Sequence, residues 1–436
     1  MALVDHNGKM ISRGVYLHKL AMWMMALYLL ADMASGFSVI YIGMDLKISL
    51  LYKMPLFILL MILIARFNLG SSLFILATLL FFLLGPLVIF FKKVNVGHLF
   101  LDFGYAVKIM MPAVVMTYFF HLYQRAPNLA FHFGKKIMQF SFLILSFNFI
   151  LAASGVGKAT YQLVEDDTAG STGLIYAGNE LGPAFLLVFG YVLHHVWNGN
   201  SRIQYLLLSL FTLLCGVTVA TKTTMLASIL LVFFIPIMNE RKHLFNLTWL
   251  KLKLFLPLIV FCVGLVIVIA DLLETLGLYD RIMWFYEQKG LIGVIWSGRN
   301  EFIAQMFVIF KEQTTLFHQV FGQGFFIETL HPRGKGAVEV DVVDTIIYFG
   351  FFGALVTSLF YLLTFYFALK KVREINTYLI PCIVLVDFLL LILSVMSGHI
   401  WMSGTVGILF GVFNSFLFYE YAVGKNGSTE AQRSYR

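Results

Sequence analysis

Long apolar stretches, separated by short polar ones, recur along the whole chain. A helix needs about 20 residues to cross a hydrocarbon layer about 30 Å thick, so stretches of about that length predict membrane spans. They lie near residues 17–36, 50–65, 69–91, 99–120, 137–154, 173–194, 203–220, 222–239, 253–273, 342–369, 377–396 and 399–422. The pattern predicts an all-α polytopic membrane protein with about 12 transmembrane helices.

The basic residues between these stretches predict which loops face the cytoplasm, because cytoplasmic loops carry an excess of Lys and Arg. With the N-terminus inside, the loops on that side contain Arg66, Arg125, Lys135, Lys136, Arg202, Arg241, Lys242, Lys251, Lys253, Lys370, Lys371 and Arg373. The opposite short loops contain Lys47, Lys53, Lys92, Lys93 and Lys158. This bias predicts that both termini are cytoplasmic, and the Lys92-Lys93 pair is the exception to it.

One connection, residues 276–340, is long and lies on the predicted outer face. Its first part contains Trp284, Tyr286 and Trp296, residue types that settle at headgroup depth. Residues 301–317 place apolar side chains at helical spacing, which predicts an amphipathic helix in the interface. The chain thus divides into a bundle of about nine spans (1–275), an outer amphipathic loop (276–340), about three further spans (341–424) and a cytoplasmic tail (425–436).

Composition narrows the class of protein. Of the 436 residues, 60% are hydrophobic and 12% are charged, whereas a soluble domain has roughly 25% charged residues. This excludes a soluble enzyme, a disordered chain and a nucleic-acid-binding protein. The net charge of +8 agrees with basic cytoplasmic loops, and the three cysteines all lie in apolar stretches, without disulfide or metal-site spacing.

Charged residues inside the apolar stretches are the strongest indication of function. Each costs at least about 2.5–3.5 kcal/mol at mid-bilayer on the insertion scale. In the predicted orientation the inner half of the membrane holds almost none. The outer half holds Asp32, Asp102, Lys108, Glu180, Lys222, Asp271, Asp341, Asp344 and His399. A transporter would place polar groups in both halves, so the asymmetry predicts a polar cup that opens to the outside.

Four polar stretches are expected to line this cup: residues 178–183, 220–224, 297–301 and 339–344. Together with the glycines that follow, their order resembles the O-antigen polymerase and ligase superfamily of bacterial membrane glycosyltransferases. Members have a Ser-Arg turn between two spans, a long outer loop that opens with Ser-Gly-Arg, a later Gly-x-Gly, and polar residues before an x-x-Gly-x-x-Gly helix. The corresponding residues here are Thr221-Lys222, Ser297-Gly298-Arg299, Gly322-Gln323-Gly324, and Glu339, Asp341 and Asp344 before Gly350 and Gly353.

The resemblance covers roughly residues 173–355, and the chain departs from it at two points. Lys222 stands where the family usually has Arg, which replaces a forked bidentate contact by a point charge. Glu339 and Asp341 stand where the ligases have a His. The second departure favours a polymerase over a ligase.

The resemblance implies a donor glycan on a polyprenyl diphosphate, an anion that leaves without a protonating acid. The site must then supply positive charge, and the candidates are Arg299 and Lys222, with Arg281 and Arg333 in reserve. An acceptor hydroxyl needs orientation or a base, for which the candidates are Asp341 or Glu339, then Asp344. Further contacts to the substrate are expected from Asn179, Glu180, His331 and His399.

The same residues also have structural interpretations. Acidic residues are favoured near a helix N-terminus, as at Asp341 and Asp344, and Arg299 could anchor the loop beside Trp296. No cofactor or metal is required, although Glu339, Asp341 and Asp344 together could bind Mg²⁺. The expected partners are the lipid-linked glycan, membrane lipid and a chain-length regulator, with no nucleic acid.

The sequence thus favours a polysaccharide polymerase in the bacterial cytoplasmic membrane, with its active site outside. Two alternatives remain: a ligase that transfers glycan to a lipid or wall acceptor, and a flippase or solute transporter.

Overall fold

The computed structural model describes residues 15–162, 168–199, 201–243, 246–254, 256, 259, 283, 286–288, 290, 296, 299–331, 337–374 and 377–426. Its first half comprises α1 (Val15–Phe37), the π-helical turn η1 (Ser38–Ile42), α2 (Ile48–Phe67), α3 (Leu69–Lys93), α4 (Val96–Arg125), α5 (Pro127–Ala153), β1 (Ala159–Gln162), β2 (Thr168–Ser171), α6 (Gly178–Asn198), α7 (Arg202–Val219) and α8 (Lys222–Asn239). It continues with η3 (Arg241–His243), α11 (Arg299–Gln313), α12 (Leu316–Phe321), η4 (Gly324–Leu330), α13 (Asp341–Lys371), α14 (Ile380–Met396) and α15 (Gly404–Asn426).

The predicted all-α membrane architecture is confirmed at this level. Within the described residues, seven helices are long and apolar enough to cross a membrane: α1 with η1, α2, α3, α4, α5, α7 and α13. Shorter apolar helices occupy residues 223–239 and 380–396, and the apolar stretches near 173–194 and 399–422 coincide with α6 and α15. The ninth predicted span, 253–273, lies almost wholly outside the described residues, so the total of twelve stays a prediction.

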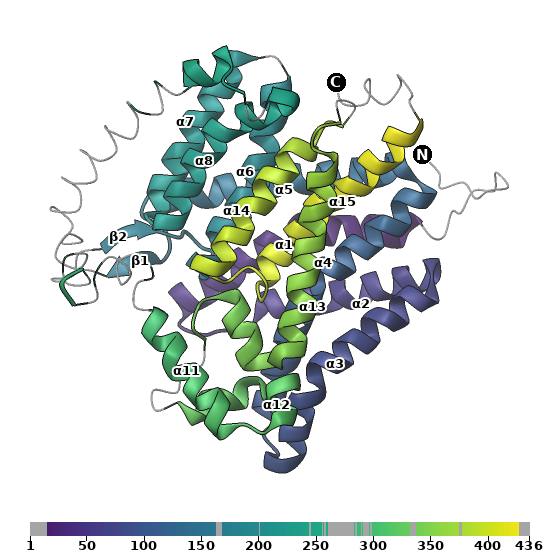
Figure 1. Ribbon diagram of the computed structural model, residues 1–436, viewed down its shortest axis with the longest axis vertical. Helices are drawn as coiled ribbons and strands as arrows, with labels where there is room; N and C mark the ends of the chain where they lie inside the picture. Colours follow the sequence, from purple (N-terminus) through teal and green to yellow (C-terminus); the bar gives the residue numbers. More distant parts are fainter. Residues whose placement is uncertain are drawn as a thin grey trace.

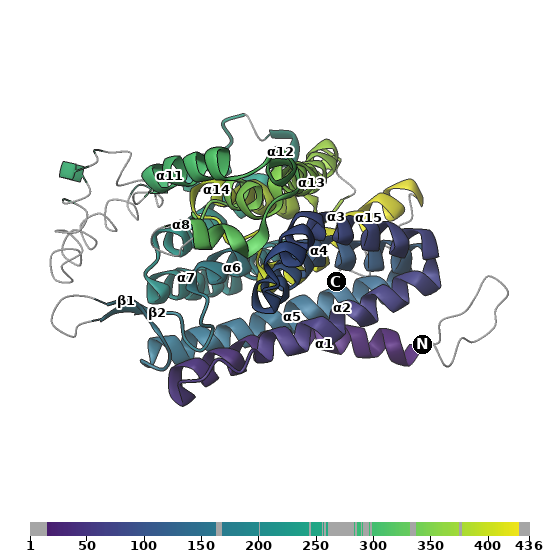
Figure 2. The ribbon, with the colours of Figure 1, turned by 90° about the horizontal axis from the view of Figure 1, so that it is seen from below.

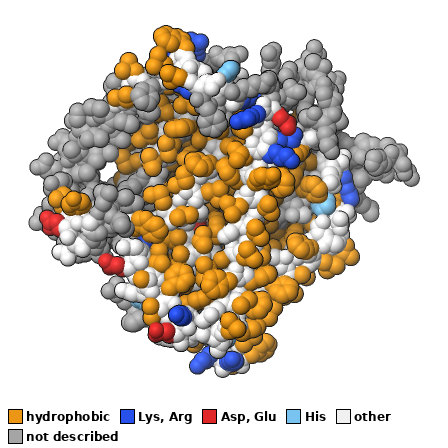
Figure 3. Space-filling view, in the orientation of Figure 1, with side chains coloured by type: hydrophobic (Ala, Val, Ile, Leu, Met, Phe, Trp, Pro, Cys, Tyr) orange, Lys and Arg blue, Asp and Glu red, His pale blue; other side chains and the backbone are white. Residues whose placement is uncertain are grey.

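The surface agrees with a lipid environment. A broad band of apolar side chains covers the face seen in Figure 3, and Lys and Arg side chains lie mostly beyond its edges. Large apolar residues such as Phe74 and Leu206 are 74% and 69% exposed. A water-soluble monomer rarely exposes apolar patches of this size, and lipid is the solvent that accommodates them.

The helix α15 forms the centre of the bundle and packs closely along α4 (Figure 1). Every residue of α15 from Gly404 to Leu417 is buried. Glycines allow the two backbones to approach, because a Cβ at Gly411 would lie 2.6 Å from Val115 Cβ and one at Gly407 would lie 3.2 Å from Pro112 Cδ. Small residues at close helix contacts are typical of membrane bundles, where packing rather than water exclusion drives association.

The loops alternate between two ends of the bundle. One end, here called the site end, carries the loops between α1 and α2, α3 and α4, α5 and α6, α7 and α8, and α14 and α15. The start of α1 and the end of α15 lie together at the opposite end (Figures 1 and 2). The structure therefore places both ends of the described chain on one side, and which side faces the cytoplasm stays a prediction.

Polar contacts also close the opposite end, which the sequence predicted to be almost free of buried charge. Arg241 donates to the carbonyl oxygens of Glu374 and Thr377. The Glu420 carboxylate, 1% exposed, accepts hydrogen bonds from the backbone N–H groups of Tyr378 and Leu379 at 2.9 and 2.8 Å. Glu420 is thus a buried acidic side chain at the opposite end, and it was not among the charged residues that the sequence singled out. Its carboxylate satisfies N–H groups at the start of α14, which have no partner within that helix.

A small β-hairpin adds the one sheet of the described residues to a fold expected to be all-α. Strands β1 and β2 pair antiparallel, with Ala159 opposite Ser171 and Tyr161 opposite Ala169. The hairpin lies against the α7–α8 turn, where Thr160 Oγ1 donates to the carbonyl oxygen of Val219 at 2.8 Å. It therefore forms part of the site end.

The amphipathic segment predicted at residues 301–317 forms two helices, α11 and the start of α12. On α11, Met306, Ile309 and Phe310 are buried. The Phe310 ring lies 6.0 Å from that of Phe351 on α13. The apolar side of α11 therefore packs against protein.

Glycines fix the outer loop to a kink in α13. Gly350 has φ +70°, and a Cβ there would lie 2.3 Å from the carbonyl oxygen of Val320. Gly322 has φ +81°, and a Cβ there would lie 2.1 Å from the carbonyl oxygen of Tyr348. A Cβ at Gly85 of α3 would lie 2.1 Å from the carbonyl oxygen of Gly322. Two of the motif glycines, Gly322 and Gly350, thus meet at one three-way contact, where any side chain would separate the backbones.

We expect Gly350→Ala to destabilise the protein by more than about 2 kcal/mol, because it adds a backbone clash to a conformation (φ +70°, ψ −178°) that is essentially restricted to glycine and costs another residue about 1–3 kcal/mol. Thermal unfolding in detergent measures the effect. Gly43→Ala is the matched control, since Gly43 also has a positive φ (+73°) but nothing within 4 Å of an added Cβ. Equal losses in the two variants would mean that the contact with Val320 contributes nothing.

Candidate functional site

The structure brings the four predicted polar stretches together at the site end. They meet around residues 397–403, the connecting segment between α14 and α15. Ser403 donates a hydrogen bond to the Glu180 carboxylate, and the backbone N–H of Ile400 donates to both oxygens of Asp341 at 3.1 Å. The turn at 220–224 reaches the same region, since a Cβ at Gly182 would lie 3.1 Å from Thr224 Oγ1.

Asp341 and Asp344, both predicted to be catalytic, are buried and bind backbone. Asp344 accepts from the N–H groups of Val338 and Glu339 at 2.6 and 3.0 Å, which fixes the strand-like segment that leads into α13. Asp341, 1% exposed, fixes the connecting segment through Ile400. These contacts give both carboxylates a positioning role. Their catalytic role stays a prediction.

Arg299 and Glu339, predicted as phosphate clamp and base, form an ion pair. The Arg299 guanidinium lies 2.8 Å from the Glu339 carboxylate and 2.7 Å from the carbonyl oxygen of Met396. Glu339 itself has φ +68°, and Gly398 packs so closely that its Cβ would lie 2.7 Å from the carbonyl carbon of Glu339. Arg299 therefore joins the start of α11 to the end of α14 and to the segment before α13.

We expect Arg299→Ala to loosen this junction, because the Glu339 carboxylate then loses its ion pair. The pair is partly exposed, so its contribution to stability is no more than about 1 kcal/mol. Limited proteolysis between residues 299 and 340 should become faster, while thermal unfolding of the bundle changes little. Arg299→Lys keeps the charge and should restore most of the protection. If the rate of proteolysis were unchanged in Arg299→Ala, Arg299 would not be a positioning residue for this junction.

The remaining predicted site residues are more dispersed. Asn179 is exposed in the first turn of α6 beside Glu180. His331 is buried, with its ring 5.0 Å from that of Phe302, and His399 lies in the connecting segment with φ +62°. Lys222 begins α8, but its side chain lies outside the described residues, as do Arg281 and Arg333.

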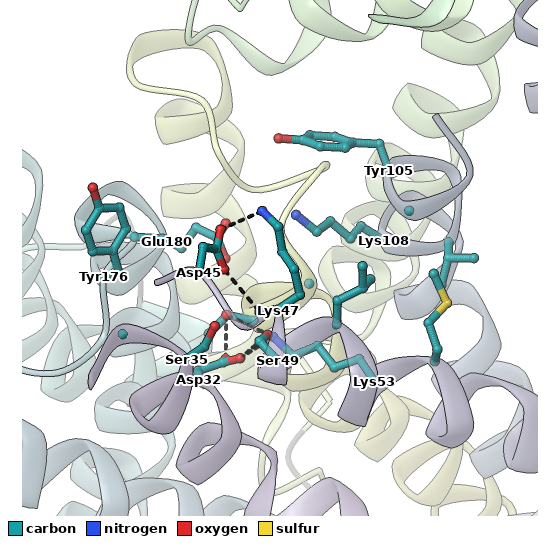
Figure 4. Close-up of a pocket in the computed structure, with 18 of the residues that line it drawn as sticks. Asp32, Ser35, Asp45, Lys47, Ser49, Lys53, Tyr105, Lys108, Tyr176 and Glu180 are labelled. Carbon is teal, nitrogen blue, oxygen red and sulfur yellow. Dashed lines mark hydrogen bonds and ion pairs between the residues drawn. The ribbon is translucent and has the colours of Figure 1, made fainter. Parts of the chain in front are cut away.

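A cavity of about 440 Å³, lined by both charged and apolar side chains, opens beside the connecting segment, between α1, α2, α4, α6 and α15. We call it the lysine cavity. Its ionisable and aromatic lining residues, most of them drawn in Figure 4, are Asp32, Asp45, Lys47, Lys53, Phe100, Tyr105, Lys108, Tyr176 and Glu180. Of the predicted site residues, Glu180 lines it.

One side of the lysine cavity is a closed charge network. The Lys53 ammonium lies 2.6 Å from Asp32 Oδ1, and both side chains are less than 10% exposed. Asp32 also accepts from the hydroxyl groups of Ser49 and Thr405, at 2.5 and 2.6 Å. Gly404 leaves room for the lysine stems, since its Cβ would lie 3.4 Å from Lys53 Cδ. This network joins α1, α2 and α15, and its charges are neutralised within the protein.

Lys108, on α4, differs from Lys53 in having no neutralising partner among the described residues. Among the described residues it has no ion pair or hydrogen bond, and its ammonium lies 4.4 Å from the centre of the Tyr105 ring. Figure 4 shows the side chains of Lys108 and Lys47 reaching toward the same part of the cavity. Lys47 pairs with Asp45 at 2.5 Å, and this hydrogen bond lowers the pKa of the Asp45 carboxyl, which stays ionised. Both ammonium groups line the cavity, where an anion could contact them.

Sequence reasoning missed this cavity, although the signal was present. Asp32, Lys108 and Glu180 were noted as charges inside apolar stretches, and Lys47 and Lys53 were assigned to a short outer loop. Nothing in the spacing of these residues indicates that α1, α2, α4, α6 and α15 converge. The residues that meet at the cavity are far apart in the sequence, by 373 positions for Asp32 and Thr405.

Within the described part of the chain, no group of three or more His, Cys, Asp or Glu side chains is arranged to hold a metal ion. The site therefore consists of ammonium, carboxylate, hydroxyl and aromatic groups. No protein-family model, no curated protein and no solved structure matches this chain.

Proposed function

We propose that the protein is a bacterial membrane glycosyltransferase that joins oligosaccharide units carried on polyprenyl diphosphate, and that the lysine cavity binds the diphosphate. The observation that carries the proposal is Lys108, a cation without an ionic partner among the described residues, which shares a cavity with a carboxylate, Glu180, and with aromatic side chains. The lysine can bind a phosphate, the carboxylate can accept hydrogen bonds from carbohydrate hydroxyl groups, and the aromatic side chains can pack against sugar rings.

The reaction that fits these groups is a displacement at the anomeric carbon of the donor sugar. The acceptor hydroxyl forms the new bond to that carbon, the bond to the diphosphate oxygen breaks, and the polyprenyl diphosphate leaves with the electron pair. Lys108 and Lys47 stabilise the negative charge that develops on the leaving group. The Glu180 carboxylate, fixed by Ser403, takes the proton of the acceptor hydroxyl.

The position of the cavity supports a substrate that is held in the membrane. It opens at the site end, beside the exposed apolar residues Phe100 and Leu101 of α4. A lipid-linked diphosphate can enter there from the bilayer while its glycan extends into water. The proposal places the site end outside the cytoplasmic membrane and the basic opposite end inside, in agreement with the distribution of Lys and Arg.

A polymerase is preferred to a transporter because of the contrast between the two ends. A substrate path would need polar lining in both halves. At the opposite end, described polar groups bond to one another, as His18 does with Tyr118, or to backbone, as Glu420 does. A ligase would use the same lipid-linked donor, and it differs from a polymerase in the acceptor that receives the glycan.

Purified protein in vesicles, supplied with a polyprenyl-diphosphate-linked oligosaccharide, tests the proposal. We expect products of two or more units on one carrier lipid, with release of free polyprenyl diphosphate. Substrate that crosses the bilayer without chain growth would instead identify a flippase. In cells, deletion of a polymerase leaves single units on the final acceptor, whereas deletion of a ligase leaves long chains on the carrier lipid.

A further inference from the structure

A second, apolar hollow of about 810 Å³ lies between α3, α4, α13 and α15. We call it the lateral groove. Its volume falls in the range of roughly 300–1,000 Å³ that is usual for ligand sites. Its walls are Phe74, Ile75, Ala77, Thr78, Phe81, Phe82, Ile109, Met110, Ala113, Met116, Thr117, Phe120, Phe352, Val356, Thr357, Leu359, Phe360, Leu363 and Phe418. Figure 2 shows α3 running beside α4 and α13.

The lateral groove is continuous with the lipid-facing surface. Three of its helices, α3, α4 and α13, are candidate membrane spans. Its rim residues Phe74 and Leu363 are 74% and 48% exposed, whereas Phe82 and Thr357 in its floor are 1% and 3% exposed. A hollow that opens sideways among lipid-facing residues is filled from the bilayer, so its occupant is a hydrocarbon chain.

The lining has three hydroxyl groups, those of Thr78, Thr117 and Thr357, and two of them are bonded within the protein. The Thr78 hydroxyl donates to the carbonyl oxygen of Phe74 at 2.9 Å, and that of Thr357 donates to Gly353 at 2.8 Å. Both hydroxyl groups are thus satisfied within their own helices. What remains is a surface of aromatic rings and flexible methionines, which adapts to an irregular, branched chain.

For a lipid whose head group lies at the site end, the depth of the groove selects a long chain. Phe82 lies ten residues before Lys92 at the site end of α3, which is about 15 Å along a helix, and Phe74 lies eighteen residues before it, about 27 Å. One leaflet contributes about half of a hydrocarbon core of about 30 Å. A chain anchored by a phosphate at the site end therefore reaches the groove only if it is longer than one leaflet.

We propose that the lateral groove binds the isoprenoid chain of a polyprenyl-phosphate lipid whose head group lies at the site end. This inference rests on the proposed function for the identity of the lipid, and it adds a tail site separate from the lysine cavity. The two sites lie on different faces of α4: Gly104, Lys108 and Met111 line the cavity, whereas Ala113, Met116 and Phe120 line the groove.

A tail-labelled probe tests the inference. The protein is reconstituted in phosphatidylethanolamine–phosphatidylglycerol vesicles with polyprenyl phosphate, free of sugar, that carries a diazirine near the end of its chain. We expect crosslinks to α3, α4 and α13 at groove residues, competed by unlabelled polyprenyl phosphate. Ala77→Trp fills the groove and should lower labelling about tenfold, the factor that corresponds to about 1.4 kcal/mol of lost packing. The control, Leu80→Trp, changes an exposed residue of the same helix outside the groove and should label like the wild type.

Each result decides between occupants. Crosslinks outside the groove, or equal labelling of Ala77→Trp and wild type, would overturn the inference. Groove labelling that excess phosphatidylglycerol removes as well as polyprenyl phosphate does would identify a general phospholipid site and also overturn it. Specific groove labelling by a protein that forms no glycan product would leave the tail site standing and reject the proposed polymerase. Chain growth without groove labelling would support the proposed polymerase and reject the tail site.

Discussion

Lys108→Met should lower the rate of glycan chain growth by about 10²–10³-fold, the loss that follows when one preorganised charge or donor is removed from a developing anion. Lys108 has no ionic partner among the described residues, so its charge is available to the substrate, and its removal leaves no buried carboxylate unpaired. The folded protein should therefore remain stable. Initial rates of product formation in vesicles measure the effect.

Two further variants make this prediction specific. Lys108→Arg keeps the charge and should retain more activity than Lys108→Met, whereas Lys108→Glu should be inactive. Lys311→Met, which changes an exposed lysine on α11, should match the wild type. If Lys108→Met were folded and as active as wild type, the lysine cavity would not be the diphosphate site.

Lys53→Met should have a large effect of a different kind, a loss of stability of about 3–5 kcal/mol, because removal of one partner leaves a buried charge uncompensated. Lys53 and Asp32 are 2.6 Å apart and nearly inaccessible, and Asp32 cannot move to water without breaking its bonds to Ser49 and Thr405. Thermal unfolding in detergent measures the loss.

The double variant Asp32→Asn/Lys53→Met provides the decisive comparison. It removes both charges, so it should be more stable than Lys53→Met alone, even though it carries one more substitution. If the double variant were less stable than Lys53→Met, the two residues would not be coupled as an ion pair. Comparison with Lys108→Met distinguishes Lys53, which stabilises the helix bundle, from Lys108, which is proposed to bind the substrate.

Several features of the fold follow from local sequence. A run such as residues 69–91 has almost no polar side chain, and a helix is the way for it to satisfy its backbone in lipid. The alternation of loops and the position of basic residues then place α1 and α15 at a common end. The helix ends were less certain: α6 begins at Gly178, and a β-hairpin precedes it, because short polar loops carry no strong periodicity.

The predicted motifs had a mixed outcome. The sequence predicted that Glu180, Arg299, Glu339 and Asp341 line one polar cup, and the structure places them near one connecting segment. The sequence assigned them to substrate, whereas the structure shows Asp341 and Asp344 bound to backbone N–H groups and Arg299 paired with Glu339. Residue type alone cannot separate a carboxylate that fixes a loop from one that contacts substrate, because both uses require the same oxygens.

By itself, the sequence determined that the protein is a helical membrane protein, where most of its apolar helices lie and at which end charged residues gather, since each depends on the cost of moving a few neighbouring residues from water into lipid. Only the tertiary structure decided which charges neutralise one another and which remain available. Lys53 and Lys108 are equally unfavourable in an apolar helix, yet Lys53 meets Asp32 from a different helix and Lys108 meets an aromatic ring. That distinction depends on contacts between distant parts of the chain, and the proposed chemistry rests on it.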